Sequence, residues 1–169
     1  YGGAGGQSSS TDTVGAVYGT PAPPLYAGSG GGSGTNAEYD GGRGGGLVWI
    51  ETTGAVYVAG MITANGMRPS TEIAGGCTNG GGGSGGGIYI NCGSFSQSTG
   101  SWLKANGGSG NSFSSGASGS GGGGGGRIAL VITDTTQSVQ VYFQYQGGDG
   151  YEDGQAGTES IALMRRLKI

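Results

Sequence analysis

The chain contains no histidine and few charged residues. Seven of its 169 residues are Lys or Arg and ten are Asp or Glu, which gives a net charge of −3. The absence of histidine excludes Ser-His and Cys-His nucleophile pairs. The sparse basic residues form no footprint for nucleic acid. We therefore expect neither an enzyme nor a nucleic-acid-binding protein, and we expect no cofactor.

Long apolar runs and cysteines are also scarce. No apolar run approaches the roughly 20 residues needed to cross a bilayer, so no membrane span is expected. The chain starts at Tyr1 and not at Met, without a signal peptide, which suggests a processed and exported chain. In a secreted protein Cys77 and Cys92 would most simply form one disulfide, worth about 3 kcal/mol in the loop-entropy model. Two free buried thiols are the alternative, and a zinc site would need more ligands.

Glycine is the abundant residue, with 46 copies. Each ordered glycine costs roughly 0.5–1 kcal/mol relative to alanine, so such a composition is typical of disordered chains unless it carries a period. Against disorder, the Val, Ile, Leu, Tyr and Trp residues are clustered in short runs with strong strand propensity.

A repeat accounts for the glycine. Leu47, Ile88 and Ile128 follow glycine runs at intervals of 41 and 40 residues, and each starts a β-branched segment. An Asn or Gln lies 18 residues after each start, at Asn65, Asn106 and Gln146. We expect these three to occupy equivalent turns, because Asn tolerates a left-handed backbone.

The repeat predicts one all-β domain over residues 1–169, with almost no helix. Its parts are a lead-in over 1–40, units over about 41–74, 75–115 and 116–156, and a truncated unit over 157–169. Two arrangements fit: a solenoid in which each unit stacks on its neighbours, or a sandwich-like body of antiparallel hairpins. The glycine arms are either surface loops or left-handed extended helices with three residues per turn that bond to each other.

The stretches "GGRGGGLVWIETTGAVYVAGMITANG", "GGGGSGGGIYINCGSFSQSTGSWLKANGGSG" and "GGGGGGRIALVI" are similar to glycine-rich repeat regions of large secreted or cell-surface microbial proteins. The arms resemble the polyglycine bundles of some bacteriophage tail-tip adhesins and springtail antifreeze proteins. These resemblances imply an extracellular or cell-surface location and a non-enzymatic role.

Possible binding residues are few. The carboxylates share no repeat position, so a solvated acidic surface is favoured over an acid-base pair, and a calcium site in "GGDGYEDGQAG" is a minor alternative. Aromatic residues in irregular segments are candidates for contacts with glycans or neighbouring subunits: Tyr18, Tyr26, Tyr39 and Tyr151. The last strand-like segment could pair with another chain through Ile161, Leu163, Leu167 and Ile169.

These features favour an extracellular structural protein, a building block of a surface layer, appendage or filament. Its expected partners are like subunits or other parts of a surface assembly. The first alternative is an adhesin that binds carbohydrate or a surface receptor through loops of the glycine arms, and the second is an ice-binding protein favoured by Thr-rich patches.

Overall fold

The computed structural model describes residues 2–7, 13–34, 40–69, 80–110, 119–134, 136 and 140–164. Within these residues the protein contains nine β-strands and no helix, which confirms the all-β prediction. The strands are β1 (Leu47–Glu51), β2 (Ala55–Val58), β3 (Met61–Thr63), β4 (Gly87–Cys92), β5 (Ser94–Gln97), β6 (Trp102–Lys104), β7 (Arg127–Ile132), β8 (Phe143–Gln144) and β9 (Thr158–Leu163).

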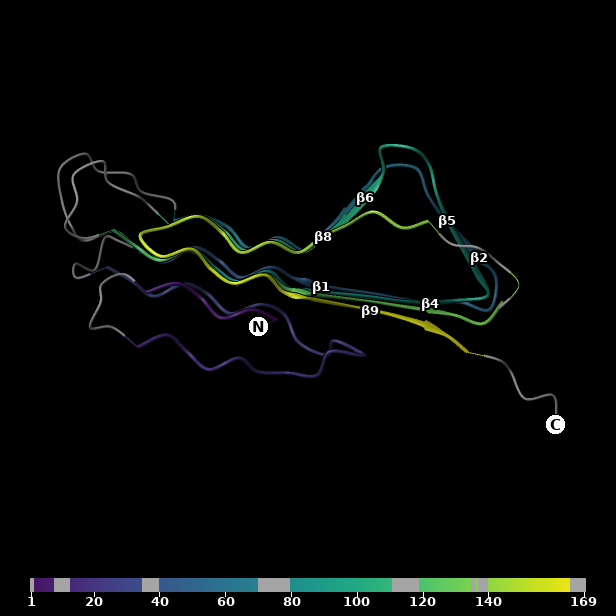
Figure 1. The fold of residues 1–169 in the computed structure, drawn as a ribbon, viewed down its shortest axis with the longest axis horizontal. Helices are drawn as coiled ribbons and strands as arrows, with labels where there is room; N and C mark the ends of the chain where they lie inside the picture. The colour runs from purple at the N-terminus through teal and green to yellow at the C-terminus, as the bar shows by residue number, and fades with distance from the viewer. Residues whose placement is uncertain are drawn as a thin grey trace.

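Equivalent strands of successive units pair in parallel and form three sheets. The sheet orders are β1-β4-β7-β9, β2-β5 and β3-β6-β8. Figure 1 shows the three sheets enclosing a triangular section at one end of the molecule. No antiparallel pair occurs among the described strands, so the antiparallel hairpins of the second arrangement do not form there: every strand pairs with its equivalent in another unit. The first two units contribute one strand to each sheet, the third contributes β7 and β8, and the truncated fourth contributes β9, so all pairing is between units.

The strand register corrects the alignment of the first two units. Val48, and not Leu47, lies opposite Ile88, so this step is 40 residues. The step is 39 in the second sheet, where Ala55 pairs with Ser94, and 41 in the third, where Met61 pairs with Trp102. The shifts arise because the second unit has a shorter first corner and a longer second corner. The alternation of inward and outward side chains fixes the register, since a one-residue slip would turn every side chain to the other face.

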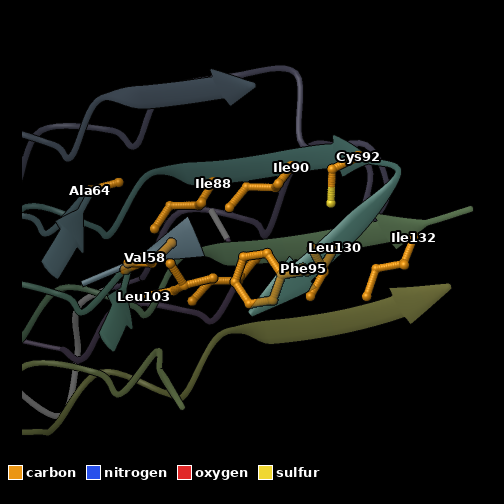
Figure 2. Packing of buried hydrophobic residues seen from close by; sticks show 11 residues of the cluster. Val58, Ala64, Ile88, Ile90, Cys92, Phe95, Leu103, Leu130 and Ile132 are labelled. Carbon is orange, nitrogen blue, oxygen red and sulfur yellow. The ribbon is translucent and has the colours of Figure 1, made fainter. Parts of the chain in front are cut away.

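The core fills the space inside the triangle. Ile88 and Ile90 of β4 and Leu130 of β7 are completely buried, and Phe95 is 1 % exposed. Figure 2 shows these side chains pointing inward from different strands toward Leu103 and Val58. Strands β4 and β7 are buried on both faces, as expected for the inner strands of a covered parallel sheet.

The lead-in lies against the start of the outer face of the four-stranded sheet. Arg127 at the start of β7 is 5 % exposed, and its Nη2 donates to the carbonyl oxygens of Tyr18 (3.0 Å) and Gly19 (3.3 Å). Farther along the sheet, Trp49 lies against Tyr89 with ring centroids 4.3 Å apart. The guanidinium therefore fastens the irregular lead-in to the regular sheet.

The glycine-rich segments pack as ordered layers, not as separate loops. Four inbound segments, each leading into a first strand, form the middle row: residues 40–46, 80–86, 119–126 and 152–157. Three return segments lie on one side of that row: residues 64–69, 105–110 and 145–150. Two cover segments, residues 2–7 and 28–33, lie on the other side. In Figure 1 these segments extend from the sheets toward the opposite end of the molecule.

Hydrogen bonding in these layers repeats every three residues. Consecutive amides of residues 81–86 donate to three different neighbours in turn, with N···O distances of 2.7–3.0 Å. Their acceptors, in order, are the carbonyls of Gly32, Gly121, Met67, Ser29, Gly124 and Ala64. A period of three matches an extended helix with three residues per turn, whose N–H and C=O groups all point outward.

Close approach makes glycine necessary in the middle of the bundle. A Cβ at Gly82 would overlap the carbonyl oxygen of Gly108, and one at Gly85 would overlap that of Ala105. Both oxygens belong to a return segment that is hydrogen-bonded to its neighbours. Side chains are tolerated where a position faces outward, as at the exposed Arg43.

Candidate functional site

The stack of units has two open edges. At the first edge, β1, β2 and β3 each pair on one side only among the described strands. At the opposite edge, the one described partner of β9 is β7, and that of β8 is β6. A strand with one unpaired side presents a row of backbone donors and acceptors that can template another strand.

Side chains at the first edge face inward but are only partly covered. Val48, Ile50, Val56 and Ile62 are half-buried. Their partners one unit later are Ile88, Ile90, Phe95 and Leu103, none more than 1 % exposed. The difference arises because each inner unit is covered on both sides and the first unit on one side only. A further unit stacked here would complete the burial.

The opposite edge has the matching deficiency. Ile161 pairs with Leu130 and Leu163 with Ile132, so both face the core side of β9. They are 49 % and 53 % exposed, whereas Leu130 and Ile132 are completely buried. Glu159 lies on the same side of β9, and the pKa of Tyr145 is raised by burial and then by this carboxylate. This edge is therefore apolar with one acidic group at its start.

The structure places two of the four expected assembly residues on this edge. Ile161 and Leu163 lie on β9, while Leu167 and Ile169 lie outside the described residues. Of the candidate contact aromatics, Tyr26 and Tyr151 are 55 % and 50 % exposed, and Tyr39 lies outside the described residues.

Tyr18 has a structural environment within the lead-in. Its hydroxyl donates to the carbonyl oxygen of Ala27 at 3.0 Å, and its ring meets that of Tyr26 edge-on at 6.5 Å. Tyr18 and Tyr26 are brought together, while Tyr151 lies at the tip where residues 145–150 turn into residues 152–157.

The Asn and Gln positions form a ladder and not a series of left-handed turns. The Asn65 Oδ1 accepts the backbone N–H of Asn106 at 2.8 Å, and the Asn106 Oδ1 accepts that of Gln146 at 2.9 Å. No described residue other than glycine has a positive φ, so the expected left-handed backbone is wrong. These side chains instead link successive units where the last strand of each becomes a return segment.

Cys92 is a free thiol buried at the end of β4, and burial raises its pKa. The expected disulfide between Cys77 and Cys92 is therefore not formed in this structure, where Cys92 packs in the apolar core; Cys77 itself lies outside the described residues.

The acidic tip has hydrogen-bonding roles of its own. The Asp153 carboxylate accepts the Gly150 amide at 3.0 Å, and that of Glu152 accepts the Gln7 amide at 2.8 Å. The described residues contain no group of three or more His, Cys, Asp or Glu placed to hold a metal ion. They also contain no helix that could cross a membrane.

A shallow depression lies on the outer face, at the ends of β1, β4 and β7. Its volume is about 700 Å³. It is lined by Glu51, Thr52, Thr53, Tyr89, Asn91, Val131, Thr133 and Met164. Sequence reasoning missed this site because its residues come from four units and share no motif. The available signal is that threonines follow the first strands β1 and β7.

The sequence matches no protein-family model, no curated protein and no solved structure. Function is therefore inferred from the geometry of this chain alone.

Proposed function

We propose that the protein is an extracellular structural building block of a surface layer, appendage or filament. In this proposal the three sheets form a short β-solenoid, and the glycine segments form a polyglycine II-type bundle that stiffens it. The observation that carries the proposal is the pair of open, apolar edges at opposite ends of one parallel stack. The two edges are complementary, because each leaves strand backbone and apolar side chains uncovered that a neighbouring unit of like shape would cover.

End-to-end contact between copies would join unlike surfaces of the two molecules. The first edge of one copy would lie against β9 of the next, continuing the four-stranded sheet in the same strand direction. Contacts of this head-to-tail kind do not close on themselves unless the rotation closes a ring, so they generate filaments. In the register of the sheet, Ile161 would lie opposite Ile50, and Glu159 would lie opposite Val48. Burial of Ile161 against Ile50 would supply roughly 0.8 kcal/mol per buried CH₂ group.

The test is self-association of the purified chain. We expect sedimentation velocity to show concentration-dependent growth, and negative-stain electron microscopy to show threads of uniform width. Ile161→Lys should abolish growth, because it places a charge on the core side of β9. Val17→Lys is the matched control, since Val17 is a 48 % exposed apolar residue of the lead-in, next to the Tyr18 carbonyl that contacts the inner strand β7.

A mixing experiment sharpens the test. The Ile161→Lys variant keeps its first edge intact, so it should cap growing ends and shorten wild-type threads at substoichiometric amounts. A chain that stays monomeric at millimolar concentration, or equal effects of the two lysine variants, would refute end-to-end assembly.

The second candidate function, an adhesin for carbohydrate, is favoured by the outer-face depression. Tyr89 lines it together with hydroxyl and amide side chains, and Trp49, 42 % exposed, lies against Tyr89. Aromatic rings flanked by hydrogen-bonding groups are suited to sugar rings. A glycan array should then show binding that Trp49→Ala removes and Tyr57→Ala, a 65 % exposed residue of β2, does not. Failure of every glycan to bind would exclude this alternative.

A further inference from the structure

The packing pattern of the glycine bundle predicts a third cover segment, and the described residues contain only two. In the middle row, residues 80–86 lie between residues 40–46 and residues 119–126. On the return side, each gap between adjacent inbound segments is covered by one return segment. On the other side, residues 28–33 cover the first gap and residues 2–7 cover the third. The gap between residues 80–86 and residues 119–126 has no covering glycine segment.

A groove lies at that position. Its volume is about 700 Å³, and its walls come from both cover segments and from the two inbound segments. Residues 13–16 and Tyr18 line its outer side. The groove therefore coincides with the position that the pattern leaves vacant.

Four buried backbone groups along this gap have no hydrogen-bond partner among the described residues. The amides of Gly121 and Gly124 have no partner among the described residues, and neither do the carbonyls of Gly82 and Gly85. All four residues are buried. Buried backbone donors and acceptors are paired in more than about 90 % of cases. Gly82, Gly121 and Gly124 line the groove, and Gly85 directly follows the lining residue Ser84. Two donors and two acceptors along this one gap therefore call for an occupant that has both kinds of group.

The neighbouring gap shows what such an occupant looks like. There, the amides of Gly28 and Gly31 donate to the carbonyls of Gly45 and Gly42, both at 2.8 Å. In the same gap, the carbonyls of Ser29 and Gly32 accept the amides of Ser84 (2.9 Å) and Gly81 (2.8 Å). Gly82 and Gly85 are the equivalents of Gly42 and Gly45 one unit later, and Gly121 and Gly124 are the equivalents of Gly81 and Ser84. An extended strand in the groove would thus have two backbone donors three residues apart and two backbone acceptors three residues apart.

The same gap fixes the composition of the strand. A Cβ at Gly28 would overlap the carbonyl oxygen of Ser84, and one at Gly31 would overlap that of Gly81. The position after Gly28 holds a serine, so side chains are tolerated between the required glycines. A strand in this position needs glycine at every third residue. Residues 13–18 do not meet this requirement, because the positions three residues before and after Gly15 are Asp12 and Tyr18.

We propose that this groove binds an extended glycine-rich polypeptide strand with glycine at every third residue, running antiparallel to residues 80–86. The strand completes the cover layer and pairs with the four open backbone groups. Recognition is by the main chain, and selectivity comes from the absence of Cβ atoms at the donor positions. The groove and the open sheet edges are different surfaces, so strand binding and end-to-end assembly can fail independently.

The experiment is a titration of the full chain, labelled with nitrogen-15, with the peptide Gly-Ser-Gly-Gly-Gly-Ser written twice. We expect shift changes at the Gly121 and Gly124 amides, and about tenfold slower hydrogen exchange there on binding. In the free protein these two amides should exchange at least about tenfold faster than those of Gly122 and Gly125, which donate to Glu152 and Gln155. A peptide with alanine at every third position should produce neither change.

A variant tests the location. Gly81 lines the groove, and a Cβ there has room, because its nearest neighbour is the Gly121 carbonyl oxygen at 3.4 Å. Gly81→Leu should therefore place a side chain in the groove and block the peptide. Gly46→Leu is the control, since a Cβ there meets nothing within 4 Å and Gly46 does not line the groove. Both variants should keep the wild-type melting temperature within a few degrees.

Three results would overturn the proposal. Strong protection of Gly121 and Gly124 without peptide would mean that the chain itself fills the groove. Unchanged shifts on titration would mean that water satisfies the open groups. Equal responses to the glycine and alanine peptides would mean that binding does not depend on close backbone contact.

Discussion

Substitution of two adjacent glycines tests whether backbone contact holds the bundle together. A Cβ at Gly82 would overlap the Gly108 carbonyl oxygen and lie 2.8 Å from the Gly123 nitrogen. A Cβ at Gly81 meets its nearest atom, the Gly121 carbonyl oxygen, at 3.4 Å, which is ordinary contact. Gly82→Ala should therefore be severely destabilising, and Gly81→Ala should not.

The expected loss follows from the hydrogen bonds that must give way. To accept the methyl group of Gly82→Ala, residues 105–110 have to move away from residues 80–86. This disrupts the bonds from Gly108 N to Gly83 O (2.8 Å) and from Gly123 N to Gly108 O (2.9 Å). A buried group left without its partner costs about 1–3 kcal/mol, and loss of unfolded-state freedom returns about 0.4–1 kcal/mol. The net destabilisation is about 2–4 kcal/mol.

Thermal unfolding followed by circular dichroism and calorimetry measures the difference. For a chain of this length 1 kcal/mol corresponds to about 2–4 °C, so Gly82→Ala should melt roughly 5–15 °C below wild type. Gly81→Ala should match wild type or gain up to about 1 kcal/mol, because alanine narrows the unfolded ensemble. Equal melting temperatures for the two variants would refute the reasoning, since it would mean that these segments do not pack at the observed distance.

Four further outcomes are expected. Phe95→Ala should cost about 3–5 kcal/mol in urea unfolding, because the ring is fully enclosed in the core. Asn106→Ala should cost about 1–2 kcal/mol by removing the acceptor for the next unit's backbone amide, and Asn106→Asp, which keeps that acceptor, should cost less. Cys92 should react with a thiol reagent far more slowly in the folded protein than in denaturant, because burial raises its pKa and blocks access. The pKa values of the Tyr89 and Tyr145 side chains are raised above 10.0, mainly by burial. Their contribution to folding stability is therefore complete below pH 10 and is lost as the pH rises through the folded-state pKa values. Melting curves at alkaline pH should show a smaller loss of stability for each Tyr→Phe variant than for the wild type.

The repeat and the strand positions could be predicted from the sequence because side chains record them. The first strands of the three full units contain runs of β-branched, aromatic and apolar residues shortly after a glycine run, and strand propensity in such runs is strong. The register could not be read as easily. Aligning Leu47 with Ile88 maximises similarity of letters, whereas the fold aligns Val48 with Ile88, because inward and outward positions alternate.

The layered bundle could not be predicted in detail, because a glycine run carries no side-chain pattern. Ser84 is the only side chain in residues 80–86, and both its amide and its Oγ bond the backbone of Ser29. The glycine amides on either side carry no such mark of the segment that they reach. Those partners follow from which units stack together and from how the lead-in folds back. The groove is a consequence of that arrangement, so no motif in the sequence indicates it.

The sheet and the glycine bundle are one continuous hydrogen-bonded layer. The ladder of the four-stranded sheet passes without a break into the middle row: Gly87 N donates to Gly46 O at 3.0 Å, and Arg127 N donates to Gly86 O at 2.9 Å. Side chains decide which strands are neighbours, and the glycine segments inherit those neighbours because they are the direct continuation of the strands. This division explains how glycine runs with no side-chain information can still fold to one arrangement. It also explains why the glycines at closest contact should be more sensitive to substitution than most exposed strand residues.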